Sequence, residues 1–394
     1  QLGLNDSKDR GDTDGDVGDL LPEVVLSTTE RATAVAAGLR HTVAILDDDT
    51  VRCWGYNGKG QLGVGHIRNV GDNENEMGDN MAVTELGTEV TPNGIYAGGW
   101  HTCAIVNADQ LKCWGYNQWG ELGLGDKNDR GDESFEMGDD LDYVDLGDDV
   151  SVTSLALGDW HSCALIDDGD VKCWGKNFAG QLGLDDTDHR GDNDGEMGDT
   201  LEAVYLGDLK ATAIACGEEH TCAILEGGEL RCWGLGSSGQ LGQGNSENVG
   251  DSSGDMSNLL GIDLGEGRTA VEVTAGGNHT CARLDNDDVK CWGSNEYGQL
   301  GQGDKLFRGY NPNEMGDFLE PIDFGTDRII HSLSAGYYHN CALVDEIDEV
   351  GAVACWGANF KGQMGLGISE TENIGDDPDE MGDNLQTADL GGKT

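Results

Sequence analysis

Short apolar segments recur along this chain, and turns of glycine, aspartate and asparagine separate them. One set of four consists of a small-residue segment such as SLALG at 154–158, a segment such as HTCAI at 101–105, a third ending in Cys-Trp-Gly, and a fourth such as YVDLG at 143–147. Apolar runs of this length between such turns are typical of β-strands. The pattern therefore predicts an all-β protein.

The four segments belong to one repeat, whose marker is the tripeptide Cys-Trp-Gly. The tripeptide begins at Cys53, Cys113, Cys173, Cys232, Cys291 and Cys355, with spacings of 60, 60, 59, 59 and 64 residues. Four-stranded units repeated radially form the blades of a β-propeller. We predict a single propeller domain over 1–394, with strands of an incomplete blade at 1–30 and repeats at about 31–90, 91–150, 151–209, 210–268, 269–327 and 328–394.

One copy of the repeat, Gly98 to Gly123, shows its framework residues: His101, Ala104, Trp114, Asn117 and Leu122. This pattern resembles the regulator of chromosome condensation repeat family, and the resemblance covers nearly the whole chain. It implies a seven-bladed β-propeller. The chain departs from the family pattern in its long acidic loop, which contains Gly-Asp and Glu-Met-Gly-Asp, and in its paired cysteines.

The number of blades follows from counting the parts of the repeat. Gln-Leu-Gly, or its variants, occurs seven times, whereas Cys-Trp-Gly occurs six times. We therefore predict seven four-stranded blades, the first of them incomplete because three strands (roughly 45 residues at this spacing) lie upstream of Gln1 or come from another part of the protein. A six-bladed ring with a spare strand is the alternative.

Ten of the twelve cysteines form pairs within a repeat: Cys103/Cys113, Cys163/Cys173, Cys222/Cys232, Cys281/Cys291 and Cys341/Cys355. If the chain reverses near Ala108, Cys103 faces Cys113 on the neighbouring antiparallel strand, close to disulfide reach. Zinc is the competing interpretation, but it needs four converging ligands. Since disulfides persist in oxidising compartments, we expect an extracellular or cell-surface protein.

Two cysteines remain outside these pairs. Cys53 faces Val43, and Cys216 replaces a small residue of an inner strand. Both are expected to be buried free thiols, although Cys53 could pair outside this chain.

The charge balance narrows the classes of partner. The chain has 23 basic and 75 acidic residues, a net charge of −52. Such a surface repels phosphate backbones, which argues against nucleic acid as a partner. It suits a cationic partner, a divalent ion or a salty environment, and solubility alone is the simplest explanation. No apolar run is long enough to span a bilayer, so no direct membrane insertion is expected.

The long acidic loop offers a candidate cation site. Asp132, Glu136 and Asp139 recur at equivalent positions, and calcium takes six to eight oxygen ligands. Calcium in these loops is one hypothesis, and a loop whose acids bond its own backbone is the other. Arg130-Gly131-Asp132 is an adhesion-like triplet, but other repeats replace its arginine, which favours a loop scaffold.

One histidine occupies the same position in each repeat: His41, His101, His161, His220, His279 and His339. Residues at equivalent positions of different blades do not converge on one substrate, so a catalytic role is disfavoured. We expect each imidazole to bond the backbone of its own blade.

The connections between the first and second segments and after the third segment lie at the same end of a four-stranded antiparallel blade. Their variable positions carry aromatic residues: Trp100, Trp119, Trp160, Phe178, Tyr297, Tyr338 and Phe360. Tryptophan and tyrosine are enriched where interfaces concentrate binding energy. These residues are the candidate partner-binding site, and rings folded over their own blade are the alternative.

The leading hypothesis is a non-enzymatic extracellular propeller that binds a protein or glycan partner, or serves as a structural module in a larger multi-subunit surface assembly. We find no nucleophile–base pair and no phosphate loop, so we expect no enzyme. The family resemblance implies two alternatives: a guanine-nucleotide exchange factor for a small GTPase, and a propeller-type inhibitor of another enzyme.

Overall fold

The computed structural model describes residues 1–13, 15–345, 351–368 and 372–391, which fall into two compact units. Unit 1 comprises Gln1–Ser7, Glu23–Leu206 and Gly250–Ser253, and unit 2 comprises Lys8–Pro22, Gly207–Val249 and Gly254–Thr394. Part of the predicted turn between Cys341 and Cys355, and the last residues of the final predicted repeat, lie outside the described residues.

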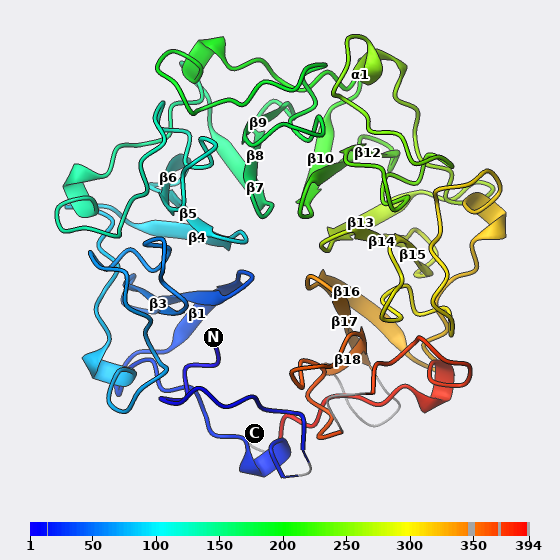
Figure 1. Ribbon diagram of the computed structural model, residues 1–394, viewed down its shortest axis with the longest axis horizontal. Coiled ribbons are helices and arrows are strands. Elements are labelled where there is room, and N and C mark those ends of the chain that lie inside the picture. Colours follow the sequence, from blue (N-terminus) through cyan, green and yellow to red (C-terminus); the bar gives the residue numbers. More distant parts are fainter. Residues whose placement is uncertain (14, 346–350, 369–371, 392–394) are drawn as a thin grey trace. The chain divides into compact units, whose positions relative to one another are not determined.

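Each unit contains three antiparallel three-stranded sheets, in which the strands lie side by side in chain order (Figure 1). The sheets of unit 1 are β1 (Ala32–Ala37), β2 (His41–Leu46) and β3 (Val51–Gly55); β4 (Pro92–Ala97), β5 (His101–Val106) and β6 (Gln110–Gly115); and β7 (Val152–Leu157), β8 (His161–Ile166) and β9 (Val171–Gly175). Those of unit 2 are β10 (Ala211–Cys216), β11 (His220–Leu225) and β12 (Leu230–Gly234); β13 (Ala270–Ala275), β14 (His279–Leu284) and β15 (Val289–Gly293); and β16 (Ile329–Ala335), β17 (His339–Asp345) and β18 (Ala352–Gly357).

Helical structure in the described part of the chain consists of single turns in the acidic loops. These are α1 (Asp255–Asn258) and the 3-10 turns η1 (Gly18–Leu20), η2 (Gly78–Asn80), η3 (Gly138–Asp140), η4 (Gly198–Thr200), η5 (Gly316–Phe318) and η6 (Gly382–Asn384). None of these helices has the length or the apolar character needed to cross a bilayer.

The fourth predicted strand is an extended segment rather than a regular strand. In the first full repeat, the Thr84 amide donates one hydrogen bond to Val51 of its own sheet, at 3.0 Å. The next two carbonyls face the following repeat: Glu85 accepts the amide of Gly138, and Leu86 accepts Lys112 Nζ at 2.8 Å. The segment does not complete a ladder with its own sheet because these backbone groups bond the next repeat.

The hydrophobic core of each unit lies between successive sheets. In unit 1, Leu111 and Leu122 of one repeat pack with Leu155 and Trp174 of the next. A glycine permits the closest approach: Gly63 has φ +64°, and a Cβ there would lie 2.9 Å from the indole nitrogen of Trp114. That nitrogen donates a hydrogen bond to the Gln61 carbonyl at 3.1 Å. The Gln-Leu-Gly element of this repeat therefore contacts the tryptophan of the next repeat.

Gln1 occupies the corresponding position beside the tryptophan of the first sheet. Its carbonyl accepts the Trp54 indole N–H at 2.7 Å, as that of Gln61 does for Trp114. Gln1-Leu2-Gly3 is thus placed like the Gln-Leu-Gly element of the other repeats, while the incomplete blade at 1–30 remains a prediction. The strands that the count places upstream remain a prediction.

The expectation for the histidines was wrong. His41 Nε2 lies 2.8 Å from Thr102 Oγ1 in the next repeat rather than near backbone of its own sheet. The same contact joins His101 to Ser162 at 2.8 Å and His279 to Asn340 at 3.0 Å. The imidazole lies close to Gly38, where an added Cβ would come within 2.5 Å of its Cε1, so a side chain there would clash with the ring.

The cysteines pair in the register that the turn near Ala108 predicts. Cys103 faces Cys113 and Ala104 faces Lys112 across β5 and β6. Disulfides join all five expected pairs, with Cα–Cα distances of 4.0 to 4.1 Å. Cys53 is a buried free thiol facing Val43. Within the described residues Cys216 forms no disulfide either, but it is only partly buried.

Candidate partner-binding surface

The first and third connections of each repeat lie at the same end of the sheet and are hydrogen-bonded to each other. The Tyr116 amide donates to the Trp100 carbonyl at 3.1 Å, and the Lys176 amide donates to the Trp160 carbonyl at 2.9 Å. The single chain reversal between β5 and β6 returns the end of β6 to the start of β5, which explains the contact. Variable residues of both connections are therefore presented together.

In unit 1 these connections form a tryptophan patch, which we define as Tyr56, Trp100, Tyr116 and Trp160. Trp100 and Trp160, about one repeat apart, stack with ring centroids 5.8 Å apart and an interplanar angle of 21°. Tyr56 meets Trp100 edge-on at 5.8 Å, and Tyr116 meets Trp160 edge-on at 5.4 Å. Offset and edge-to-face pairs of this kind are favourable beyond the area that they bury.

Three basic side chains lie over the aromatic rings of these connections in unit 1. The Arg40 guanidinium lies 5.6 Å from the Trp100 centroid, and Lys59 Nζ lies 4.8 Å from that of Tyr116. Lys176 Nζ lies 5.8 Å from Trp160 and 5.7 Å from Phe178. These distances are those of cation–π contacts. On a chain of net charge −52, this end of unit 1 combines aromatic rings with positive charge.

A second ring cluster in unit 1 joins two third connections to an acidic loop. Trp119 meets Phe178 at 5.2 Å and His189 at 4.9 Å, and Phe178 meets His189 at 4.6 Å. Phe178 is 56% exposed, so this cluster is open to solvent. Because Lys176 contacts both Trp160 and Phe178, it links the cluster to the tryptophan patch.

In unit 2 the predicted aromatic residues form a three-ring patch, defined as Tyr297, Tyr338 and Phe360. The ring centroids are 5.1 Å apart for Tyr297 and Tyr338, 5.1 Å for Tyr297 and Phe360, and 6.2 Å for Tyr338 and Phe360. The interplanar angles are 64° to 76°. Tyr337 packs against Tyr338 at 4.4 Å.

The seven predicted aromatic residues thus fall into three clusters: Trp100 with Trp160, Trp119 with Phe178, and Tyr297 with Tyr338 and Phe360. Sequence reasoning missed Tyr56, Tyr116 and the three cations. Tyr56, Tyr116 and Lys176 each directly precede the asparagine of the repeat, so variation at that position was the available signal. Whether these clusters bind a partner remains a prediction.

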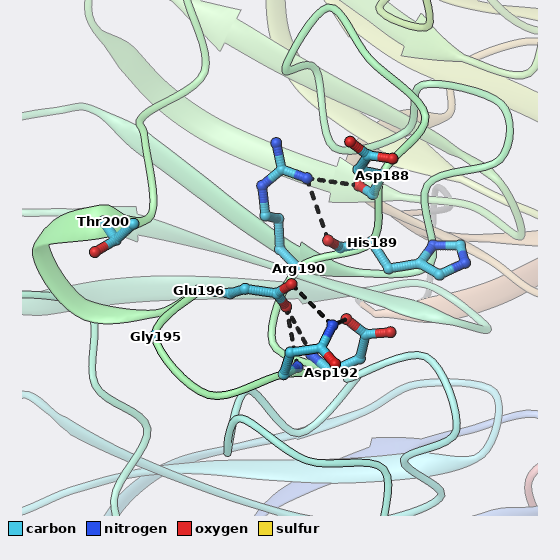
Figure 2. A pocket seen from close by; sticks show the side chains of 8 residues that line it. Asp188, His189, Arg190, Asp192, Gly195, Glu196 and Thr200 are labelled. Atoms are coloured by element: carbon cyan, nitrogen blue, oxygen red, sulfur yellow. Dashed lines mark hydrogen bonds between the residues drawn. The ribbon is translucent and has the colours of Figure 1, made fainter.

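The acidic loop of the third full repeat encloses an open cavity of about 480 Å³ (Figure 2). Arg190 donates to the carbonyls of Asp188 and His189, at 2.9 and 3.2 Å, and pairs with Asp186 at 2.6 Å. Glu196 accepts the amides of Asp192 and Asn193 (Figure 2). The arginine of this Arg-Gly-Asp triplet is therefore hydrogen-bonded within its own loop. This supports the interpretation of the triplet as part of a loop scaffold rather than an adhesion signal.

The recurring acids of the loop bond backbone, although in the last repeat the carboxylates of Asp376, Asp377 and Glu380 lie within 4.8 Å of one another. Glu76 Oε2 accepts the amides of Gly71, Asp72 and Asn73 at 3.0 to 3.1 Å. Asp79 instead accepts the amide and the hydroxyl of Thr28, at 3.0 and 2.7 Å. These contacts favour the self-bonded loop over the calcium hypothesis, because the glutamate oxygen is already saturated with amide donors.

The repeat matches a known family of repeats. Models described as "Regulator of chromosome condensation (RCC1) repeat" match residues 32–61, 152–181, 211–240 and 270–299, and residues 168–224 and 287–343. The ultraviolet-B receptor UVR8 of Arabidopsis thaliana is 28% identical over 89% of this chain and 70% of its own length. The probable E3 ubiquitin-protein ligase HERC4 of Homo sapiens is 32% identical over 54% of this chain, but over only 18% of its own length.

Solved structures show the same fold. The crystal structure of human WBSCR16 matches with a TM-score of 0.67 and 20% identity, over 88% of this chain and 81% of that one. Yeast RCC1 (Prp20), crystallised bound to Kap60, matches with a TM-score of 0.62 and 21% identity, over 88% and 74%. At these identities the likeness concerns the fold alone.

Proposed function

Since this chain belongs to the regulator of chromosome condensation repeat family and has its β-propeller fold, we propose that it is a non-enzymatic extracellular binding module. Its contacts with a protein or glycan partner are made by the aromatic residues of the first and third connections. The observation that carries the proposal is the Trp100–Trp160 stack. Two tryptophans on short connections, neither fully buried, form a rigid apolar platform of the kind that interfaces use.

The extracellular assignment is supported by the five disulfides, because such bonds are rare where cytosolic reductants keep thiols free. When the unreduced protein is unfolded and alkylated, its intact mass should show two labelled thiols, Cys53 and Cys216, and twelve after reduction. Twelve alkylated thiols before reduction would sink this assignment.

The binding test uses Trp100→Ala combined with Trp160→Ala. The wild-type protein, the double variant and Tyr205→Ala are applied to a glycan array and to fractionated extracellular proteins. Tyr205 is 59% exposed in unit 1 and lies outside the patch, so its substitution controls for loss of an exposed ring. We expect binding to be lost in the double variant and retained in the control. Unchanged binding in the double variant would refute the assignment of this surface.

Guanine-nucleotide exchange is the second candidate function, and the fold shared with yeast RCC1 (Prp20) favours testing it. Small GTPases loaded with a fluorescent guanine nucleotide are mixed with the chain, and nucleotide release is followed. We expect no acceleration. Accelerated release would replace the binding-module proposal with exchange activity.

A further inference from the structure

The loop ends of the two units differ in charge. In unit 1 the first and third connections (38–40, 56–60, 98–100, 116–120, 158–160 and 176–180) contain Arg40, Lys59 and Lys176 against the single acid Asp159, a net charge of +2. In unit 2 the corresponding connections (217–219, 235–239, 276–278, 294–298, 336–338 and 358–362) contain Glu218, Glu219 and Glu296 against Lys361, a net charge of −2.

The aromatic rings of the two units also differ in whether a basic side chain lies over them. Each aromatic group of unit 1 that we describe above has a lysine or arginine of the chain itself over one of its rings. Within the residues that the structure describes, no cation–π contact involves Tyr297, Tyr338 or Phe360. Lys361, which follows Phe360, instead pairs with Asp9 at 2.9 Å. The three-ring patch thus lacks an internal cation.

Carboxylates border this patch. Glu218 accepts hydrogen bonds from the Tyr337 hydroxyl and from Asn278 Nδ2, which fix its position beside the rings. Glu296 immediately precedes Tyr297 and is exposed. The pKa of the Tyr338 phenol is raised, first by burial and then by Tyr297, Glu218 and Glu296, so both carboxylates act on that ring. Their negative charge favours any cation that approaches the ring faces.

The patch is accessible: Tyr338 is 37% exposed and Phe360 is 36% exposed. Three rings at steep mutual angles present both faces and edges, and a cation held over a ring face is attracted by its quadrupole. The net charge of −52 also draws cationic molecules toward the chain as a whole. The patch therefore consists of exposed rings that have no cation of this chain over them, with two carboxylates beside them. These features together favour a cationic ligand.

We infer that the three-ring patch of unit 2 binds a basic side chain, arginine or lysine, of a protein partner. This inference rests on the proposed function and specifies its partner chemistry. The guanidinium or ammonium group contacts the faces of Tyr338 and Phe360, while Glu296 supplies an exposed acceptor. The binding unit is therefore an extended basic segment rather than a neutral glycan.

The test uses a synthetic peptide with two arginines separated by glycine, and a matched peptide with citrulline at both positions. Citrulline keeps the size and the planar shape of arginine but removes the charge and replaces one N–H donor group by a carbonyl. Binding is measured by titration calorimetry with the full chain at 0.15 M and 0.5 M NaCl, because high salt suppresses the diffuse attraction of a net charge of −52. We expect the arginine peptide to bind at least tenfold more tightly than the citrulline peptide at both concentrations.

The variants separate this patch from bulk charge, because they leave the net charge unchanged. Tyr338→Leu and Phe360→Leu should each weaken binding of the arginine peptide by about threefold to tenfold, the size of a cation–π contact. Tyr310→Leu is the matched control: Tyr310 is 39% exposed in unit 2 and packs against Phe307 outside the patch. It should leave the affinity unchanged, and Tyr338→Phe should retain most of it.

Equal affinity for the two peptides, or an equal loss in Tyr310→Leu, would overturn the inference. Its failure is distinguishable from that of the proposed function. If the alanine variants of Trp100 and Trp160 abolish partner binding while Tyr338→Leu does not affect it, the binding module stands and the basic-segment assignment falls.

Discussion

His41 of one repeat and Thr102 of the next are joined by a buried hydrogen bond of 2.8 Å between Nε2 and Oγ1. The Thr102 hydroxyl in turn donates to the Gln61 carbonyl at 3.0 Å, so the imidazole Nε2 is the donor to Thr102. His41 Nδ1 is buried and, within the described residues, has no hydrogen-bond partner. The relay from imidazole to hydroxyl to carbonyl therefore requires a neutral histidine, and it couples adjacent repeats.

This relay predicts a fall in stability on mild acidification. Burial lowers the pKa of His41 and His279 to about 4, and that of His101 and His220 to about 3. Since the pKa in the unfolded chain is near 6.5, the unfolded state takes up protons first as the pH falls. Stability is thus full above about pH 6.5 and declines toward pH 4, by about 1.4 kcal/mol per pH unit for each histidine.

Urea unfolding at pH 7.5, 6.0 and 5.0 measures this slope above the range in which exposed carboxylates titrate, and the buried Glu121, whose pKa is raised to about 8, contributes a slope of opposite sign. His101→Gln should unfold at a lower urea concentration at pH 7.5 and show a shallower dependence on pH. A free energy of unfolding that stays constant from pH 7.5 to 5.0 would contradict the buried neutral relay.

Glu121 predicts the opposite pH dependence. It occupies the position of Gln61, is fully buried, and accepts the Trp119 amide through Oε2 at 2.8 Å. Burial raises its pKa to about 8. A carboxyl whose pKa is higher in the folded state contributes stability that is full below about pH 4.5 and is lost as the pH rises through 8.

Glu121→Gln should therefore stabilise the protein by on the order of 2 kcal/mol at pH 8 and by much less at pH 5. Urea midpoints at the two pH values give the comparison, and Glu133→Gln, an exposed carboxyl in the next acidic loop, is the control. An equal gain at both pH values would mean that Glu121 is not protonated in the folded protein.

Val43→Cys should create a sixth disulfide. Val43 faces Cys53 across β2 and β3 in the register that carries the other pairs, and both side chains are buried. Closing so short a loop contributes about 2 to 3 kcal/mol of stability. Alkylation of the unfolded, unreduced variant should label one thiol, Cys216, instead of two. Labelling of three thiols would show that the geometry at this pair does not permit the bond.

Phe135→Asn should stabilise the second full repeat. Phe135 has φ +71° and is 89% exposed, whereas the equivalent Asn75 and Asn313 have φ +66° and +65°. A bulky side chain is strained in this left-handed region, which asparagine tolerates. We expect a gain of about 1 kcal/mol in urea unfolding. Phe318→Asn removes a comparably exposed ring at a position with negative φ and should give no such gain.

The acidic loops should be insensitive to calcium if their acids bond backbone. Glu76→Gln weakens three charge-assisted amide contacts and should lower the stability by about 1 to 2 kcal/mol. The melting temperature of the wild-type chain should be the same in 5 mM EDTA and 5 mM calcium (the order of an extracellular site's affinity). A calcium-dependent rise that Glu76→Gln abolishes would restore the calcium hypothesis.

Much of the fold is readable without coordinates because its elements are local. The turn between Cys103 and Cys113 brings two neighbouring strands together, so the spacing of the two residues alone predicts that they face each other. The same reasoning placed the connections that carry Trp100 and Trp119 at one end of their sheet. It failed for the fourth segment, because Leu86 bonds Lys112 of the next repeat and spacing within one repeat says nothing of that contact.

The sequence by itself determined the repeat, the three local strands of each sheet, the disulfide register and the aromatic connections, since each depends on residues near one another in the chain. Only the tertiary structure decided that His41 bonds Thr102, that Trp100 stacks on Trp160, and that the rings of unit 1 carry internal cations while the three-ring patch does not. Most of these contacts join side chains about one repeat apart. They depend on the distance and angle between packed sheets, which no local pattern encodes.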